Sequence, residues 1–304
     1  MNPAIDRTIT VDRLAFEDRA YIRSSHDSPG GRGINASCVI HAFGGKTLAI
    51  APSGGAEGKR LSKFLQGCGF EVALVSIRHE IRTNLTITDR QGVTASLNEA
   101  GPKLSAEEYG AVEALVRQRL GPARWLLLCG SLPPGVPTDF YGRLIEAARA
   151  SGASSLLDTD GPALREGLEA GPSVVAPNQH EAERLLSRAL LSRSQFLDAA
   201  AGIQRMGAGA TILSLGSRGA IGAKSGGSLM EALPPRVDAV CPIGAGDALA
   251  AAFTWSMTNS DDFADALRWG VAAGTASAKL PGLAFASLEE TKEIYRQVEL
   301  RRVE

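Results

Sequence analysis

The stretch with the clearest chemical potential is Gly244-Ala-Gly-Asp247, which runs into an alanine-rich segment of high helix propensity. Two glycines at a helix start let backbone N–H groups converge on a ligand, and the helix dipole adds partial positive charge there. Such a terminus can hold an anion, including one that gains charge during a reaction. Asp247 falls in the first turn, where the dipole favours a carboxylate. An ordinary turn with an acidic first helical residue is the alternative interpretation.

A second glycine-rich turn, Gly30-Gly-Arg-Gly33, also precedes an apolar stretch and could bring backbone close to a ligand. Arg32 within it is a fixed positive charge suited to a phosphate. The turn is not a P-loop, because the spacing and the Gly-Lys-Ser/Thr ending are missing. Arg82 is a second candidate anion ligand, and a solvated surface arginine is its alternative interpretation.

The elements that must position these residues alternate between apolar strands and helices from residue 105 onward. We predict helices at 105–119, 138–151, 161–169, 179–190, 195–206 and 262–278, and strands at 125–129, 155–157, 174–176 and 211–215. Continuous apolar strands between helices favour a parallel sheet covered on both faces. The sequence therefore predicts an α/β fold.

Polar residues follow three of these strands at the point where each strand ends. They are Gly130-Ser131, Asp158-Thr-Asp160, and Asn178 with Glu181. In open α/β sheets, ligands bind outside the carboxyl ends of the strands. This edge of the sheet is therefore the expected binding site.

Two strands at 84–89 and 93–98 alternate with period two around the turn 90–92, which predicts a hairpin with one polar face. Segment 7–28 is weakly strand-like and too polar for deep burial. We place both outside the main sheet, whose strands are apolar throughout.

Composition narrows the class of protein. The chain has 304 residues, 44% hydrophobic and 21% charged, which is typical of a globular protein with one large α/β domain or two units. Because 32 basic residues balance 33 acidic ones, no nucleic-acid or membrane partner is expected. The N-terminus is not a signal peptide, and no apolar run is long enough to span a membrane. Four scattered cysteines predict free thiols in a cytoplasmic protein, and four isolated histidines predict no metal site.

Taken together, the two glycine-rich turns resemble the two signatures of the ribokinase-like (PfkB) carbohydrate kinases. Further matches occur in the family's order along nearly the whole chain: Asn2-Pro-Ala-Ile-Asp6, Arg82-Thr-Asn84, Asn98-Glu-Ala-Gly-Pro102, Gly130-Ser-Leu-Pro-Pro-Gly135, and Pro177-Asn178 with Glu181. Several are typical of the branch that acts on phosphorylated sugars, which includes 1-phosphofructokinases and tagatose-6-phosphate kinases.

The resemblance implies a role for each matched residue. Asp247 would be the general base, and the amides of Gly244, Ala245 and Gly246 would hold the transferring phosphoryl group. The sugar hydroxyls would be bound by Asp6, Asn35 and the Gly31 backbone. The phosphate already on the sugar would be held by Arg32, Arg82 and Ser131.

The resemblance also implies the cofactors ATP and Mg²⁺. Asn178 and Glu181 match an Asn-x-x-Glu element that helps to place Mg²⁺ and the ATP phosphates, with Glu181 acting on the metal indirectly. Ser214, Gly216 and Gly219 match a nucleotide-binding turn.

For the architecture, the resemblance implies one ribokinase-like domain over residues 1–304, a three-layer α/β/α fold with a mainly parallel central sheet. A small β-lid, made of segments inserted at about 7–28 and 82–99, would cover the sugar and exclude water. A homodimer formed through the lid is the expected assembly. Family members usually begin with a strand that ends in the Asn-Pro-Ala element, whereas here only Met1 precedes Asn2. We therefore expect that strand's neighbours to be unpaired and Asp6 to be poorly anchored.

These implications predict an ATP-dependent kinase that phosphorylates a hydroxyl of a hexose monophosphate, with fructose 1-phosphate giving fructose 1,6-bisphosphate as the leading reaction. Tagatose 6-phosphate and fructose 6-phosphate are the alternative acceptors. A non-catalytic sensor of phosphosugars or nucleotides is a hypothesis of another class, and the intact Asp247, Asn178 and Glu181 count against it. A dinucleotide-binding oxidoreductase is disfavoured because its strand–Gly-x-Gly-x-x-Gly–helix unit is missing.

Overall fold

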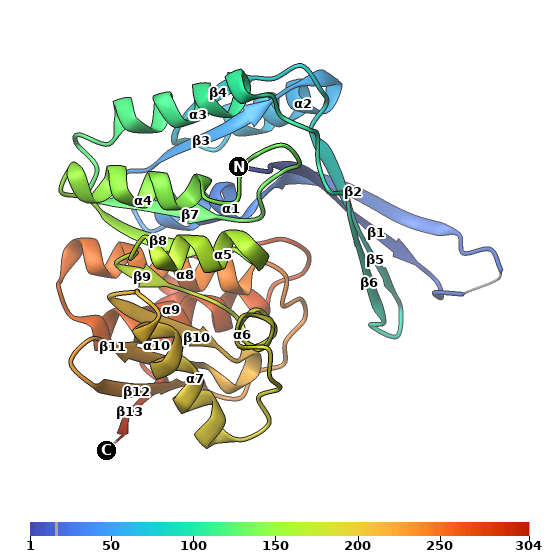
Figure 1. Cartoon of the computed structure of the whole chain (residues 1–304). Coiled ribbons are helices and arrows are strands. Elements are labelled where there is room, and N and C mark those ends of the chain that lie inside the picture. The colour runs from blue at the N-terminus through green and yellow to red at the C-terminus, as the bar shows by residue number, and fades with distance from the viewer. Residues whose placement is uncertain (16–17, 304) are drawn as a thin grey trace.

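The largest sheet has seven strands in the order β13-β12-β11-β10-β9-β8-β7 (Figure 1). The structure is a computed structural model that describes residues 1–15 and 18–303. Strands β7 to β10 run parallel, and β11, β12 and β13 are added antiparallel. The bounds are Trp125–Cys129 (β7), Ser154–Asp158 (β8), Val174–Val175 (β9), Ala210–Ser214 (β10), Ala220–Lys224 (β11), Ser228–Leu233 (β12) and Glu299–Val303 (β13). The predicted central sheet is therefore present, with an antiparallel extension at one end.

Neighbouring residues on these strands belong to different cores. Leu157 and Leu213 pack with helices α4 to α7, whereas Leu156 and Ile212 pack with α8 to α10. Because successive strand side chains point to opposite faces, this arrangement gives the predicted three layers. The helices are α4 (Phe140–Ala150), α5 (Gly161–Glu169), α6 (Gln179–Leu186), α7 (Arg193–Arg205), α8 (Ala245–Asn259), α9 (Phe263–Ala278) and α10 (Leu288–Tyr295).

The chain after residue 278 adds two elements that the sequence analysis did not predict. Helix α10 begins at a capping box formed by Ser287 and Glu290, and β13 completes the edge of the large sheet. Both are short and rich in charge, so neither shows a strong hydrophobic period.

A separate pair of parallel strands, β3 (Leu48–Ser53) and β4 (Glu71–Ser76), is connected by α2 (Gly55–Gln66). Helix α1 (Arg32–Ala42) precedes this pair, and α3 (Ala106–Arg119) packs against it. Among the pairings of the described residues, β3 joins only β4, and β7 joins only β8. Each therefore keeps one edge without a strand partner among the described residues.

A four-stranded sheet projects from the body of the molecule (Figure 1). Its order is β2-β1-β5-β6, with bounds Ala4–Val11 (β1), Ile22–Gly30 (β2), Arg82–Asp89 (β5) and Thr94–Asn98 (β6). The predicted hairpin is β5 with β6, and it lies outside the main sheet as predicted. We call this the projecting sheet.

The two faces of the projecting sheet differ in chemistry because its strands alternate with period two. One face lines a cavity with hydroxyl side chains, namely Thr8, Thr10, Thr86, Thr88, Thr94 and Ser96. The intervening residues are apolar and include Ile9, Val11, Leu85 and Ile87. Threonine suits such a strand because it is β-branched as well as polar.

In residues 1–15 and 18–303, none of the helices is both long enough and apolar enough to span a membrane.

Helices α8 and α9 approach closely because glycine faces the backbone of the other helix. A Cβ atom at Gly270 would lie 2.9 Å from the carbonyl oxygen of Leu249, and one at Gly274 would lie 2.8 Å from that of Ala245. The start of α8 is therefore held against α9. By contrast, a Cβ atom at Gly110 in α3 would meet nothing within 4 Å.

These two kinds of helical glycine predict opposite effects of substitution by alanine. Gly110→Ala should raise the free energy of unfolding by about 0.5–1 kcal/mol, because alanine loses less backbone entropy than glycine. Gly270→Ala should lower it by about 1–3 kcal/mol, because α9 must move away from α8. Urea denaturation of both variants measures these changes, and equal shifts of the same sign would contradict the close packing.

Candidate active site

A cavity of about 1140 Å³ lies between the projecting sheet and the body of the molecule. Its walls contain all six residues predicted to bind the sugar and its phosphate: Asp6, Gly31, Arg32, Asn35, Arg82 and Ser131. Gly244 and Asp247 line the same cavity. Residues that are up to 241 positions apart in the sequence are thus brought to one site.

Asp247 lies in the first turn of α8 and is only 9% exposed. Its Oδ2 accepts a hydrogen bond of 2.7 Å from Nδ2 of Asn35 in α1. Burial raises the pKa of this carboxyl to about 6, against the opposing effects of the Asn35 hydrogen bond and the Arg32 charge. Asp247 can therefore exchange a proton near neutral pH.

Gly244 precedes α8, whereas Gly246 is already the second residue of this helix. Gly244 caps the helix in the left-handed conformation, with φ 80°, which glycine adopts without strain. The N–H of Ala245, however, donates to the carbonyl oxygen of Pro242 at 3.2 Å. Ala245 must give up that bond before it can hold an anion. Neither Ala245 nor Gly246 lines the cavity.

Asp6 is firmly held, so the expectation that it would be poorly anchored is wrong. Strand β1 pairs with β2 on one side and with β5 on the other, and Asn84 Nδ2 donates to Asp6 Oδ1 at 2.8 Å. Gly30 makes room for this carboxylate, since a Cβ atom there would lie 2.3 Å from Asp6 Cγ. Burial raises the pKa of Asp6.

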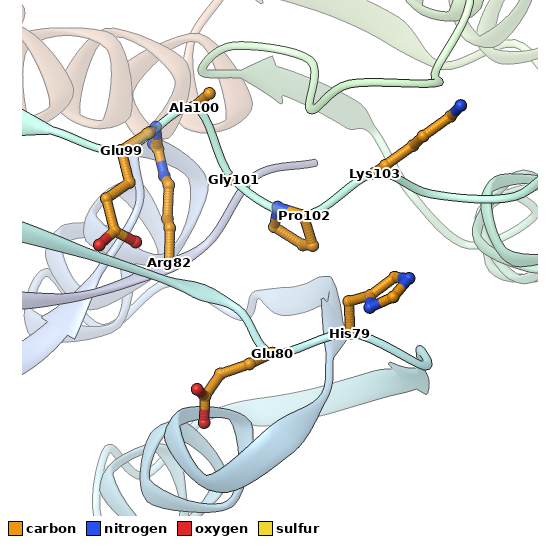
Figure 2. A pocket seen from close by; sticks show the side chains of 8 residues that line it. All are labelled: His79, Glu80, Arg82, Glu99, Ala100, Gly101, Pro102 and Lys103. Atoms are coloured by element: carbon orange, nitrogen blue, oxygen red, sulfur yellow. Dashed lines mark hydrogen bonds between the residues drawn. The ribbon is translucent and has the colours of Figure 1, made fainter.

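Arg82 starts β5 and lies between two hollows. One is the main cavity, and the other is a surface pocket of about 430 Å³ shown in Figure 2. Its Nη1 donates to the carbonyl oxygen of Glu99 at 2.9 Å, and its buried Nε has no partner among the described residues. Burial lowers the pKa of this arginine.

Ser131 lies close to the start of the chain. Nδ2 of Asn2 donates to Ser131 Oγ at 3.2 Å and to the carbonyl oxygen of Ala100 at 2.9 Å. Asn2 therefore connects the loop after β7 to the segment after β6.

Arg32 is occupied by carboxylates. Its Nη1 donates to Asp158 Oδ1 at 2.7 Å, and its Nη2 donates to Glu181 Oε1 at 2.9 Å. A phosphate on the sugar would have to compete with both. Burial raises the pKa of Asp158 to about 7, although the neighbouring Arg32 charge acts to lower it.

Asn178 and Glu181 form a capping box at the start of α6. The Glu181 N–H donates to Asn178 Oδ1, and the Asn178 N–H donates to Glu181 Oε2, both at 2.9 Å. The capping box alone is enough to explain why the two residues are three positions apart. Glu181 Oε1 is left to accept from Arg32, which connects the cap to the cavity.

The predicted nucleotide turn follows β10. Ser214 forms an isolated parallel bridge with Asn178, and Gly216 and Gly219 both have positive φ. A Cβ atom at Gly219 would lie 2.0 Å from the carbonyl oxygen of Ala232, so only glycine fits there. These residues, with Asn178 and Glu181, lie outside the lining of the main cavity. They are joined to it through the Arg32–Glu181 pair.

Within the described part of the chain, no group of three or more His, Cys, Asp or Glu side chains could hold a metal ion. Mg²⁺ often binds through substrate phosphates and water with one or two carboxylates nearby. Glu181 is a buried carboxylate outside the cavity lining, and its Oε1 accepts from Arg32, so its indirect role toward Mg²⁺ stays a prediction.

Two polar residues of the site had no role in the sequence analysis. Asp158 was noted only as part of a polar strand end, and Asn84 only as part of a motif. Their partners, Arg32 and Asp6, are 126 and 78 residues away. The position of Asp158 at the carboxyl end of β8 was the available signal.

The chain is similar to known proteins along most of its length. The family model described as pfkB family carbohydrate kinase matches residues 1–291. The Escherichia coli ATP-dependent 6-phosphofructokinase isozyme 2 is 31% identical over 296 residues, 96% of this chain and 95% of that protein. The Rhodobacter capsulatus 1-phosphofructokinase is 32% identical over 276 residues, 90% of this chain and 86% of that protein. The crystal structure of Escherichia coli phosphofructokinase-2 with substrates and products has a TM-score of 0.91 at 32% identity, covering 98% of this chain and 97% of that one.

The bond between Asn35 and Asp247 predicts a shift in proton affinity. Asn35→Ala removes a donor to the charged carboxylate, so the pKa of Asp247 should rise above about 6. A ¹³C NMR titration of the aspartate carboxyl resonances measures it. Asn98→Ala, which removes another cavity asparagine, is the control and should leave that pKa in place. A fall of the Asp247 pKa in Asn35→Ala would contradict the assignment.

Proposed function

Because this chain belongs to the pfkB family of carbohydrate kinases, we propose that it transfers the γ-phosphoryl group of ATP to a hydroxyl of a hexose monophosphate. The proposed acceptor is fructose 1-phosphate, which gives fructose 1,6-bisphosphate. Fructose 6-phosphate is a second candidate, supported by the likeness to 6-phosphofructokinase isozyme 2 along almost the whole chain. The proposed unit is one kinase domain over residues 1–304, with the segments 7–28 and 82–99 inserted as a lid.

The observation that carries this proposal is the position of Asp247. It is a buried carboxylate at a helix start, it is oriented by Asn35, and it shares a cavity with Asp6 and Arg82. A general base needs this combination of a fixed direction and a proton affinity near the working pH. The positive end of the α8 dipole lies beside it, where a transferring phosphoryl group gains charge.

The remaining side chains orient the two substrates. Asp6 and Asn35 would accept and donate hydrogen bonds to sugar hydroxyls, and Arg82 with Ser131 would hold the phosphate of the acceptor. Phosphoryl transfer depends mainly on positioning and charge neutralisation, so this set suffices on the sugar side. Asp247 then takes the proton of the attacking hydroxyl.

The nucleotide side is proposed around the start of α6 and the turn after β10. Asn178, Glu181, Ser214, Gly216 and Gly219 would place ATP. Mg²⁺, carried by the phosphates, would neutralise their charge. Glu181 would act on Mg²⁺ indirectly, from its place in the capping box of α6.

The projecting sheet is the proposed lid and the proposed dimer contact. Ile22 on β2 and Leu97 on β6 are 61% and 57% exposed, although both are large and apolar. These two strands are the edges of the sheet, where another copy could pair. A structure titled as the tetrameric inhibited form of Escherichia coli phosphofructokinase-2 shows that a relative assembles. The cysteines are free thiols, which is consistent with the cytoplasmic location that we also propose.

The reaction is tested by ADP release with Mg·ATP on fructose 1-phosphate, fructose 6-phosphate, tagatose 6-phosphate and free fructose. We expect turnover on a fructose monophosphate, and Asp247→Asn should lower kcat by about 10²–10⁴-fold while ATP still binds. Asp139→Asn, on the exposed start of α4, is the control for loss of a carboxylate. A folded wild-type chain that turns over none of these sugars, yet binds them, would instead support the sensor hypothesis.

The dimer is tested by sedimentation velocity. Leu97→Lys places a charge on the exposed edge of the lid and should convert the dimer to a monomer. Leu191→Lys is the matched control, because Leu191 is 82% exposed in the connection between α6 and α7. A wild-type monomer, or a dimer unaffected by Leu97→Lys, would remove the lid from the interface.

A further inference from the structure

Arg32 lies where three carboxylates surround one guanidinium. It donates to Asp158 and to Glu181 through different nitrogens, and it also lies in the electric field of Asp247. The Asp158 and Glu181 side chains are 9% and 2% exposed, whereas that of Arg32 is 34% exposed. Both carboxylates are therefore buried, whereas the Arg32 side chain is partly exposed and lines the cavity.

Backbone hydrogen bonds fix the main chain at Asp158 and the carboxylate of Glu181, the two residues that hold Arg32. The carbonyl oxygen of Asp158 accepts from the Gly130 N–H at 2.8 Å, and Thr159 Oγ1 donates to the Gly130 carbonyl oxygen at 2.9 Å. Glu181 is fixed by the capping box of α6. Arg32 thus connects the loop on the sugar side with the helix start on the nucleotide side.

The charges of this arrangement have a consequence for the reaction. A transferring phosphoryl group is negative and must pass close to Asp247, the base. Without a cation there, it would meet buried carboxylates of the same sign. Arg32 supplies that cation, and its planar fork can bridge two carboxylates, which a lysine ammonium cannot do in the same way.

We propose that Asp158 is a positioning residue that, together with Glu181, directs Arg32 to the phosphoryl group in transfer and away from the phosphate already on the sugar. This inference rests on the proposed function. The inference gives the two arginines that line the cavity different roles. Arg82 binds the acceptor phosphate, and Arg32 neutralises charge in the transition state.

The first test separates kcat from KM, with fructose 1-phosphate and fructose 6-phosphate as acceptors. Asp158→Asn keeps the size of the side chain and removes its charge, so kcat should fall by about 10–100-fold while KM for the sugar changes by less than about threefold. Arg82→Ala should show the reverse pattern, a raised KM. Asp139→Asn, an exposed carboxylate at the start of α4 and outside the cavity lining, is the matched control and should retain its kcat.

The second test uses chemical rescue, because loss of folded protein could also lower kcat. Free guanidinium ion at non-denaturing concentration should restore turnover to Arg32→Ala by about tenfold or more, since it can bind between Asp158 and Glu181. It should not restore turnover to the double variant Arg32→Ala/Asp158→Asn. Sodium chloride at equal ionic strength is the control.

Three results would overturn the inference. One is an unchanged kcat in Asp158→Asn. Another is a raised KM in Arg32→Ala that matches Arg82→Ala, because Arg32 would then be a ligand of the acceptor phosphate. The third is equal rescue of the single and double variants. Failure of the proposed function is distinguishable, because it appears in the wild-type chain as absence of turnover on every sugar.

Discussion

The burial of several carboxylates in one cleft is the constraint on which this structure depends. A buried charge is costly unless a partner compensates it, and each carboxylate here has one from a distant part of the chain. Asp6 has Asn84, Asp247 has Asn35, and Asp158 and Glu181 share Arg32. The cleft can therefore form only when the projecting sheet, α1, β8 and α6 are all in place.

The second constraint is the close packing of the α8 N-terminus against helix α9. Gly270 and Gly274 let α9 approach the backbone of α8 at Leu249 and Ala245, close to Asp247. Because packed interiors tolerate little extra volume, this seam holds the helix start in one position. The position of the start of α8, and with it that of Asp247, thus depends on the contact between α8 and α9.

Local patterns of apolar, glycine and proline residues predicted most of the helices and strands. The apolar run Trp125–Cys129 and the helix Gly161–Glu169 lie where their hydrophobic patterns and Gly/Pro signals placed them. Helix α10 and strand β13 were missed, because a short, charged segment is stabilised by neighbours that its own letters do not show. In such segments tertiary contacts decide the structure.

The motif matches predicted that Asp6, Asn35 and Arg82 share one site, and the structure places them in one cavity. The motifs could not show which side chains pair within that cavity. The contact of Arg32 with Asp158 spans 126 residues and leaves no local trace. Asn178 and Glu181 present a different difficulty. Their spacing is that of a capping box and also that of a nucleotide-binding element, so the same letters support a structural and a chemical role.

The hydroxyl-bearing face of the projecting sheet has a consequence for the evolution of this family. Threonine and valine have nearly the same shape and both favour strands, so one can replace the other at Thr8, Thr10, Thr86 or Thr88 with little disturbance of the sheet. Each such exchange adds or removes a hydrogen-bonding group in the cavity wall. Because these positions lie on the strands of the projecting sheet, apart from Asp247 and from the buried ion pairs, such substitutions can change the chemistry of the cavity wall while those buried groups stay as they are.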